Sequence, residues 1–321
     1  MTVPDQELAA DPELAADYEA LRHGVGGVIL PRDMLIVSGT DAVQYLQGQC
    51  SQDVAGLAEG QAADALLLSP QGKVDATIRV TRTAPDAFVI DTESGFGEAA
   101  RVRLERFRLR VKVAIEPLSW VCLAIRGPDS GSVPPASEPG VLRLPVDWPG
   151  LSGFDLIGPA PTFPEKVRRC GDAAWETVRI EAGIPLMGKE VTENTIPAEA
   201  GLVERTVSFT KGCFTGQELV ARLDARGTKV ARRLCGIVMD DSTSADLGHS
   251  VPVGATLHTT DGEHEVGRLT SVVWSPGLKA TIGLATVQRR VTPPSPVAVR
   301  WEDAGRSVEV TAEAKPLPLL G

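Results

Sequence analysis

Cysteine and histidine are scarce in this chain, whose 321 residues contain five cysteines and four histidines. The cysteines are Cys50, Cys122, Cys170, Cys213 and Cys235. No two of them form a CxxC pair, and no histidine lies at ligand spacing from them. An odd and scattered set argues against a disulfide framework, a structural zinc site and an iron–sulfur cluster held by the chain itself. We therefore expect reduced thiols and no bound metal.

Long apolar runs and an excess of positive charge are also absent. Runs such as ALLL at 65–68 are far too short to span a bilayer. The acidic first twenty residues, MTVPDQELAADPELAADYEA, lack the apolar core of a secretion signal and the arginines of a transit peptide. A net charge of −10 disfavours general nucleic-acid binding, because phosphate contacts need clustered Lys and Arg. The sequence thus predicts a cytoplasmic protein without a nucleic-acid or membrane partner.

The patterns that are present predict an α+β protein with two regions. Hydrophobic residues make up 43% of the chain, which is long enough for two or more packed units. Residues 34–48 read as a strand and a helix, and residues 65–117 as three strands, a helix and a strand, typical of an antiparallel sheet. Residues 164–183 predict a helix, and 186–210 an irregular segment. We expect a two-lobed region at 1–230 and a small β-barrel or sandwich at 231–321, where short strands alternate with Gly, Pro and Asp-Gly turns.

The octapeptide KGCFTGQE at 211–218 is the most unusual local pattern. Thr215 and Glu218 fit a capping box that begins a helix. Cys213 then lies near the positive end of that helix and close to Lys211, and both effects favour a thiolate. The alternative is a buried, inert cysteine in a tight turn, which is a common fate of free cysteine. No histidine lies nearby in sequence, so a Cys-His nucleophile has weak support.

Basic residues are concentrated around this octapeptide. Residues 204–233 contain seven Lys and Arg against three Asp and Glu. Arg222 and Arg226 are four residues apart, so they share one face of the predicted helix. The excess is either a solvated helix face or a site for an anionic small molecule.

KGCFTGQE resembles the KGC[FY]xGQE signature of the YgfZ branch of the YgfZ/GcvT folate-binding family. Three further segments agree in order: TDAVQYLQGQCSQDV resembles an early helix and turn of that family, AAWETVRIEAGIPLMGKE its W-x5-E-x-G segment, and GRLTSVVWSPGLKATIGLATV the C-terminal barrel of the glycine-cleavage T-protein. The similarity covers about residues 30–315. It implies an aminomethyltransferase-like fold, in which three lobes surround a cleft for tetrahydrofolate and the last lobe is a small β-barrel.

The resemblance also implies roles for individual residues. Glu181 matches a glutamate that hydrogen-bonds the pterin ring, and Trp175 matches a tryptophan at the folate site. Their alternatives are a helix-surface charge and a core side chain. Among the signature residues, Lys211 and Cys213 are the catalytic candidates, with Cys213 as the functional thiol. Gln217 is a candidate for binding the folate, as is Asp75. Arg222 and Arg226 are candidates for the anionic glutamyl tail.

Two departures from the T-protein pattern bear on activity. Gln217 stands where T-proteins carry an arginine. Asp75 and Ala76 match a pair of acids at a strand start, of which the second is thought to hold the reacting folate nitrogen. The second acid is therefore absent, and we expect Asp75 to point to the other face of the strand.

Three functions compete. The first is a tetrahydrofolate-binding accessory protein that supports assembly or repair of iron–sulfur enzymes, with those enzymes or assembly proteins as partners and no ordinary turnover of its own. The second is a folate-dependent aminomethyltransferase or demethylase, against which the departures argue. The third is a dinucleotide-binding oxidoreductase, because Gly95-Phe96-Gly97 begins a GxGxxA match. Glu98 would place negative charge against a pyrophosphate there, so this reading is the weakest.

Overall fold

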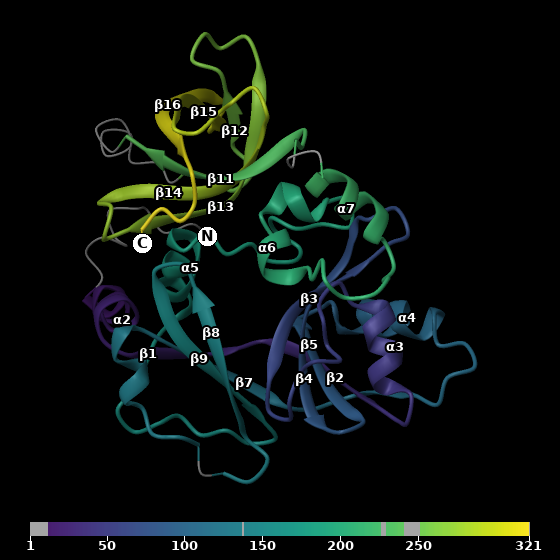
Figure 1. Cartoon of the computed structure of the whole chain (residues 1–321). Coiled ribbons are helices and arrows are strands. Elements are labelled where there is room, and N and C mark those ends of the chain that lie inside the picture. The colour runs from purple at the N-terminus through teal and green to yellow at the C-terminus, as the bar shows by residue number, and fades with distance from the viewer. Residues whose placement is uncertain (1–11, 137, 226–228, 241–250, 321) are drawn as a thin grey trace.

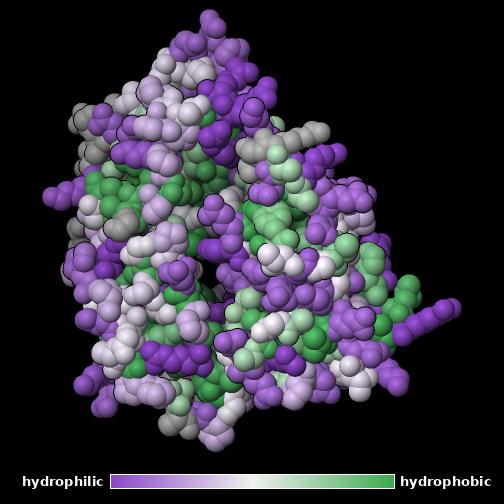
Figure 2. All heavy atoms as spheres, in the orientation of Figure 1, coloured by the Kyte–Doolittle hydropathy of each residue, from purple (hydrophilic) through white to green (hydrophobic). Residues whose placement is uncertain are grey.

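Three lobes meet around a common centre in the computed structural model (Figure 1), which describes residues 12–136, 138–225, 229–240 and 251–320. No helix within these ranges has both the length and the apolar character needed to cross a membrane. The face drawn in Figure 2 is hollowed near its middle, where the lobes approach one another.

The first lobe is a five-stranded antiparallel sheet in the order β3-β4-β5-β2-β6. Its strands are β2 (Arg32–Ser38), β3 (Ala62–Leu68), β4 (Val74–Ala84), β5 (Ala87–Glu93) and β6 (Ala114–Pro117). Helices α3 (Ala42–Gln49) and α4 (Gly97–Arg106) supply side chains to its main core. Ala76, Ile78 and Val80 alternate toward these helices, because every second side chain of a strand lies on the same face.

The second lobe is another five-stranded sheet, in the order β10-β1-β7-β9-β8. Its strands are β1 (Gly26–Leu30), β7 (Val121–Arg126), β8 (Leu142–Trp148), β9 (Leu151–Gly158) and β10 (Arg168–Arg169). Helices α2 (Pro12–His23) and α5 (Asp172–Glu181) pack together on one face, and a short helix, η1 (Pro128–Ser132), lies near β9.

The helix predicted over 164–183 is wrong in its first half. Arg168 and Arg169 instead pair in parallel with Gly26 and Gly27, and the helix begins only at Asp172. The carboxylate of Asp17, on α2, accepts a hydrogen bond of 2.7 Å from the backbone N–H of Gly171. The helix start is therefore fixed by a residue 154 positions away, which local sequence patterns do not reveal.

The segment after α5 folds onto the first lobe. It contains η2 (Pro197–Ala200), α6 (Val203–Thr206) and α7 (Gln217–Ala225). Phe214 and Val220 pack with Leu66, Leu68 and Val74 of the β3–β4 hairpin. The irregular segment expected at 186–210 thus contains two short helical turns and shares a core with the β3–β4 hairpin.

The last lobe is a closed barrel in the order β11-β14-β13-β12-β15-β16. Its strands are β11 (Arg232–Met239), β12 (Thr256–His258), β13 (Glu265–Ser275), β14 (Ala280–Gln288), β15 (Ser295–Asp303) and β16 (Arg306–Lys315). Ile180 of α5 packs against Ile282 and Leu284 on the outside of the barrel. Helix α5 therefore joins the second lobe to the barrel.

A chain of buried charges joins the first two lobes. Asp91 lies 2.7 Å from Arg32 and 2.9 Å from Arg79, and Arg79 reaches across to Asp155 of β9 at 2.6 Å. Asp155 then lies 2.8 Å from Arg126 of β7. Each carboxylate sits between two guanidinium groups, so each charge is compensated although it is removed from water.

Candidate functional site

The loop 211–216 lies over the carboxyl end of α3. The ammonium of Lys211 donates to the carbonyl oxygens of Gln47, Cys50 and Gln52 at 2.6, 2.7 and 2.9 Å. The backbone N–H of Thr215 adds a bond of 3.3 Å to the carbonyl of Gly48. Burial lowers the pKa of Lys211. All three ammonium hydrogens have partners, so Lys211 acts here as a cap for orphan helix carbonyls.

Two glycines bring the same loop against the β3–β4 hairpin. Gly216 has a φ of 81°, and a Cβ on it would lie 2.5 Å from the carbonyl oxygen of Ser69. Gly72 has a φ of 75°, and a Cβ there would lie 2.7 Å from Cβ of Leu219. Both positions need the left-handed backbone and the missing side chain of glycine.

The capping box expected at Thr215 is not the start of the helix. Helix α7 begins at Gln217, two residues later, and the positive φ of Gly216 separates Thr215 from it. The side-chain oxygen of Gln217 instead accepts a bond of 3.4 Å from the N–H of Phe214. Gln217 thus closes the turn that follows Cys213.

Cys213 is the one exposed thiol among the five cysteines, all of which lie in the described residues. Cys50, beneath the loop, is fully buried, and burial raises the pKa of its thiol to about 12. The expected alternative of a buried, inert Cys213 is therefore contradicted. Of the two arginine candidates, Arg222 is an exposed residue of α7, and Arg226 lies outside the described residues.

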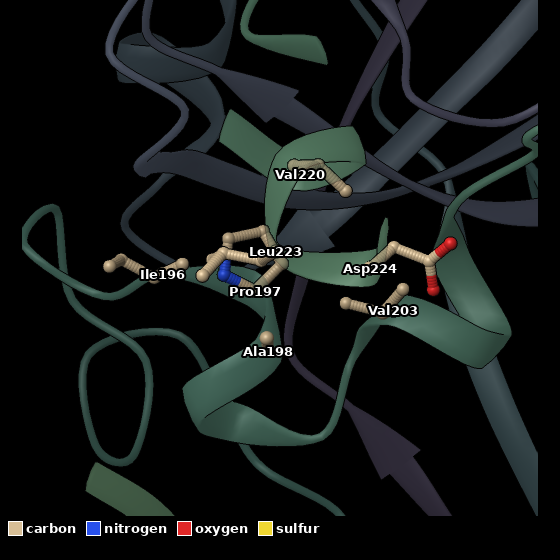
Figure 3. A pocket seen from close by; sticks show the side chains of 7 residues that line it. All are labelled: Ile196, Pro197, Ala198, Val203, Val220, Leu223 and Asp224. Carbon is tan, nitrogen blue, oxygen red and sulfur yellow. The ribbon is translucent and has the colours of Figure 1, made fainter. Parts of the chain in front are cut away.

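The groove beside α7 is too small for a folate. Figure 3 shows it between η2, α6 and α7, lined by Ile196, Pro197, Ala198, Val203, Val220, Leu223 and Asp224. Its volume is about 10 Å³, which corresponds to about one water molecule. The site for a larger ligand must be sought elsewhere.

Trp175 lies in an aromatic–cationic cluster between α5 and the second sheet. Its ring centroid is 5.0 Å from that of Trp148, and the guanidinium carbon of Arg126 lies 5.1 Å from Trp175 and 4.7 Å from Trp148. Trp175 is 8% exposed. Since Arg126 also ends the buried charge chain, Trp175 links α5 to the junction of the two sheets.

Glu181 is at the end of the same helix and is fully buried. Its carboxylate accepts hydrogen bonds from the hydroxyls of Tyr18, at 3.0 Å, and Ser275, at 2.5 Å. Burial raises the pKa of Glu181, although both hydrogen bonds act in the opposite direction. The carboxylate therefore ties α2, α5 and the barrel together, and its hydrogen-bonding positions are occupied by protein groups.

A third face of α5 carries a second set of charges. The carboxylate of Glu176 accepts two hydrogen bonds from Arg179, of 2.6 and 2.8 Å, and one of 2.7 Å from Lys189. Arg179 also donates to Glu190, at 3.2 Å, and to the hydroxyl of Ser271, at 2.7 Å. Burial alone would raise the pKa of Glu176, but the bonds from Arg179 and Lys189 lower it. Glu176 is therefore ionised at neutral pH.

A cavity of about 530 Å³ opens beside these charges. Its lining residues are Glu176, Gly188, Lys189, Val253, Leu269, Thr270, Ser271 and Val272. A Cβ on Gly188 would lie 3.0 Å from the ring of Phe96, which precedes α4 of the first lobe. The cavity thus lies between α5, the segment that follows it and the barrel, and one of its lining residues, Gly188, is close to the first lobe. Its volume falls within the range of roughly 300–1,000 Å³ typical of small-molecule sites.

Asp75 does not reach this cavity. A β-bulge opposite Leu67 and Leu68 makes Asp75 an extra residue in β4, and its carboxylate pairs with Arg103 of α4 at 2.9 Å. Ala76 is buried in the core that α4 helps to form. The expectation that Asp75 points away to the other face is therefore wrong, because the bulge breaks the alternation of the strand.

The GxGxxA match does not form a dinucleotide site. The carboxylate of Asp33 accepts hydrogen bonds of 2.9 Å from the N–H groups of both Gly95 and Gly97. A side-chain anion thus occupies the place that a pyrophosphate would take, and β5 pairs with antiparallel neighbours.

Sequence reasoning missed Glu176, Lys189 and Arg126. Glu176 and Lys189 are 13 residues apart and meet only because the chain turns after α5. Arg126 ends an apolar strand, VCLAIR, where an arginine reads as a solvent-facing residue. The i,i+3 spacing of Glu176 and Arg179 was an available signal for their ion pair.

Known proteins match the chain over both regions. Residues 6–135 match the family model described as GCVT N-terminal domain, and residues 232–319 match that of the Glycine cleavage T-protein C-terminal barrel domain. An uncharacterized protein of Haemophilus influenzae is 28% identical over 230 residues, which cover 68% of this chain and 75% of that protein. An aminomethyltransferase of Rubrobacter xylanophilus is 28% identical over 334 residues, which cover 95% of this chain and 86% of that protein.

A solved structure has the same arrangement. The crystal structure of glycine cleavage system aminomethyltransferase T from Bartonella henselae superposes with a TM-score of 0.76 at 21% identity, covering 96% of this chain and 89% of that one. The α+β fold with a C-terminal β-barrel expected from the sequence is therefore confirmed.

Proposed function

We propose that this chain binds tetrahydrofolate, or a derivative of it, in the cavity between α5 and the barrel, because residues 6–135 and 232–319 match the two domain models of the glycine cleavage T-protein. The observation that carries the proposal is the cavity itself, which has a suitable volume and both charged and apolar lining residues. The charged part of the lining is an ion pair of 2.7 Å between the carboxylate of Glu176 and the ammonium of Lys189. Trp175 and Glu181 do not line the cavity. They fix α5 against the second lobe and the barrel.

We further propose that the protein is an accessory factor of the YgfZ branch that supports iron–sulfur enzymes, and not an aminomethyltransferase. Neither Asp75 nor Ala76 lines the cavity, so β4 supplies no acid to a folate there. The signature loop instead presents an exposed thiol, Cys213, to solvent. A thiol on the surface can meet a protein partner, whereas a buried one cannot.

The first test is calorimetric titration of the protein with tetrahydrofolate in anaerobic buffer. We expect saturable binding at one site. Val253 lines the cavity and its side chain is 64% exposed, so Val253→Trp should obstruct the cavity and weaken binding without disturbing a core. Ile29→Trp is the matched control, since Ile29 is 60% exposed on β1 and does not line the cavity. Absence of binding by the unaltered protein at millimolar ligand would overturn the folate proposal.

The second test separates the accessory role from transferase activity. Cys213→Ser should retain tetrahydrofolate binding and fail to restore iron–sulfur enzyme activity in cells that lack the protein. Lipoyl-dependent transfer of a one-carbon unit to tetrahydrofolate by the purified protein would contradict the accessory role, and would favour the activity that several relatives carry in their names.

A further inference from the structure

Two charged side chains line the cavity, and they differ in their exposure to solvent. Lys189 has a side chain that is 46% exposed, whereas that of Glu176 is 24% exposed. Arg179, which holds Glu176 from behind, is fully buried. A ligand that enters the cavity therefore meets Lys189 as its accessible cation.

The backbone at Lys189 is firmly placed. The N–H of Gly188 bonds to the carbonyl of Val191 at 2.8 Å, and that of Lys189 to the carbonyl of Leu186 at 3.2 Å. The next residue, Glu190, accepts hydrogen bonds from Ser271 and from the N–H of Leu186. Only the flexible side chain of Lys189 is thus free to respond to a ligand.

The ion pair between Lys189 and Glu176 can be replaced by an ion pair between Lys189 and a ligand. Partly exposed pairs of this kind contribute little to stability. Glu176 keeps two hydrogen bonds from Arg179 when Lys189 turns away, so no buried charge is left without a partner. An incoming carboxylate can therefore replace Glu176 on Lys189 at small cost.

The apolar lining indicates the rest of the ligand. Val253, which is exposed, and Val272, which is half-buried, offer surface for an aromatic or aliphatic body beside the charged pair. A molecule with an aromatic body and a terminal carboxylate matches both features. The aminobenzoyl-glutamate half of a folate has this chemistry.

We propose that Lys189 binds the glutamate carboxylate of the folate, a role that sequence reasoning assigned to Arg222 and Arg226. Arg222 does not line the cavity, and Arg226 lies outside the described residues. The inference rests on the proposed folate binding and adds the residue that recognises the anionic end of the ligand.

The experiment compares two ligands and two variants by anaerobic calorimetry. The ligands are tetrahydrofolate and tetrahydropteroate, which lacks the glutamate. The variants are Lys189→Gln and the control Lys315→Gln, whose lysine forms a similarly exposed ion pair with Glu313 on the barrel. We expect Lys189→Gln to weaken tetrahydrofolate binding by about tenfold and to leave tetrahydropteroate binding unchanged. Lys315→Gln should change neither.

Other outcomes separate the two proposals. Suppose that the unaltered protein binds tetrahydrofolate, and that Lys189→Gln either keeps its affinity for both ligands or loses affinity for both equally. Lys189 then does not bind the glutamate carboxylate, although the proposal of folate binding is supported. If the unaltered protein binds neither ligand, the folate proposal fails, and this inference fails with it.

Discussion

The ammonium nitrogen of Lys211 lies 2.7 Å from the carbonyl oxygen of Cys50, which is 161 residues earlier in the chain. With the carbonyls of Gln47 and Gln52, this contact fastens the signature loop to the end of α3. Lys211 therefore fixes the position of the loop, and the loop exposes Cys213 to solvent.

Lys211→Met should lower the free energy of unfolding by about 2 kcal/mol, because the charge-assisted hydrogen bonds to helix carbonyls are lost. Urea denaturation measures this change. Lys73→Met is the control, because Lys73 is exposed and its ammonium donates to the side chain of Asn194. Equal changes in the free energy of unfolding for the two variants would mean that the hydrogen bonds of Lys211 stabilise the protein no more than the single hydrogen bond of Lys73 does.

Gly216→Ala should destabilise the protein by about 2–4 kcal/mol, since it adds a clash with Ser69 to the cost of a left-handed backbone. Gly60→Ala isolates the backbone cost, because Gly60 has a φ of 80° and open space around its Cβ position. Gly60→Ala should therefore cost only about 1 kcal/mol. Denaturation midpoints that coincide for the two variants would contradict the close approach of loop and hairpin.

Cys213 should react with a thiol reagent far faster than the other four cysteines in the folded protein. It is exposed, whereas burial raises the pKa of the thiols of Cys170 and Cys235 to about 11. Spectroscopic titration with a disulfide reagent should show one fast thiol, and Cys213→Ser should remove that phase. A fast phase that persists in Cys213→Ser would assign the reactivity to another cysteine.

Glu181→Gln should alter how stability depends on pH. Burial raises the folded-state pKa of Glu181 above its ordinary value of 4.5, so ionisation opposes folding. The stability that protonated Glu181 contributes is complete below that ordinary value and is lost as the pH rises through the raised one. The variant lacks this loss, so over the range above pH 4.5 its melting temperature relative to the unaltered protein should increase as the pH rises. A constant difference over that range would show that Glu181 titrates normally.

Short-range patterns predicted much of the fold. The hairpin of β3 and β4 consists of two β-rich runs on either side of a Pro/Gly turn, and the barrel strands are separated by clear turn signals. The bulge at Asp75 and the late start of α5 were missed. Both depend on partners distant in sequence, since Asp75 meets Arg103 and Gly171 meets Asp17.

The candidate site was less accessible to sequence reasoning. The octapeptide was identified as unusual, but Lys211 was predicted to take part in catalysis and Thr215 to cap a helix. Lys189 attracted no notice because a single lysine after a glycine has no pattern. The role proposed for Lys189 depends on the cavity beside it, which exists only once α5 and the barrel are packed together.

The alternating charges from Arg32 to Arg126 affect how the first two lobes unfold. Separating the two sheets without unfolding either would break the ion pair between Arg79 and Asp155. Arg79 would keep only Asp91, and Asp155 would keep only Arg126. Such half-open forms are costly, because the remaining charges lie in a largely apolar surface. The two lobes should therefore unfold as one cooperative unit, with slow hydrogen exchange of their central strands occurring through the same opening event.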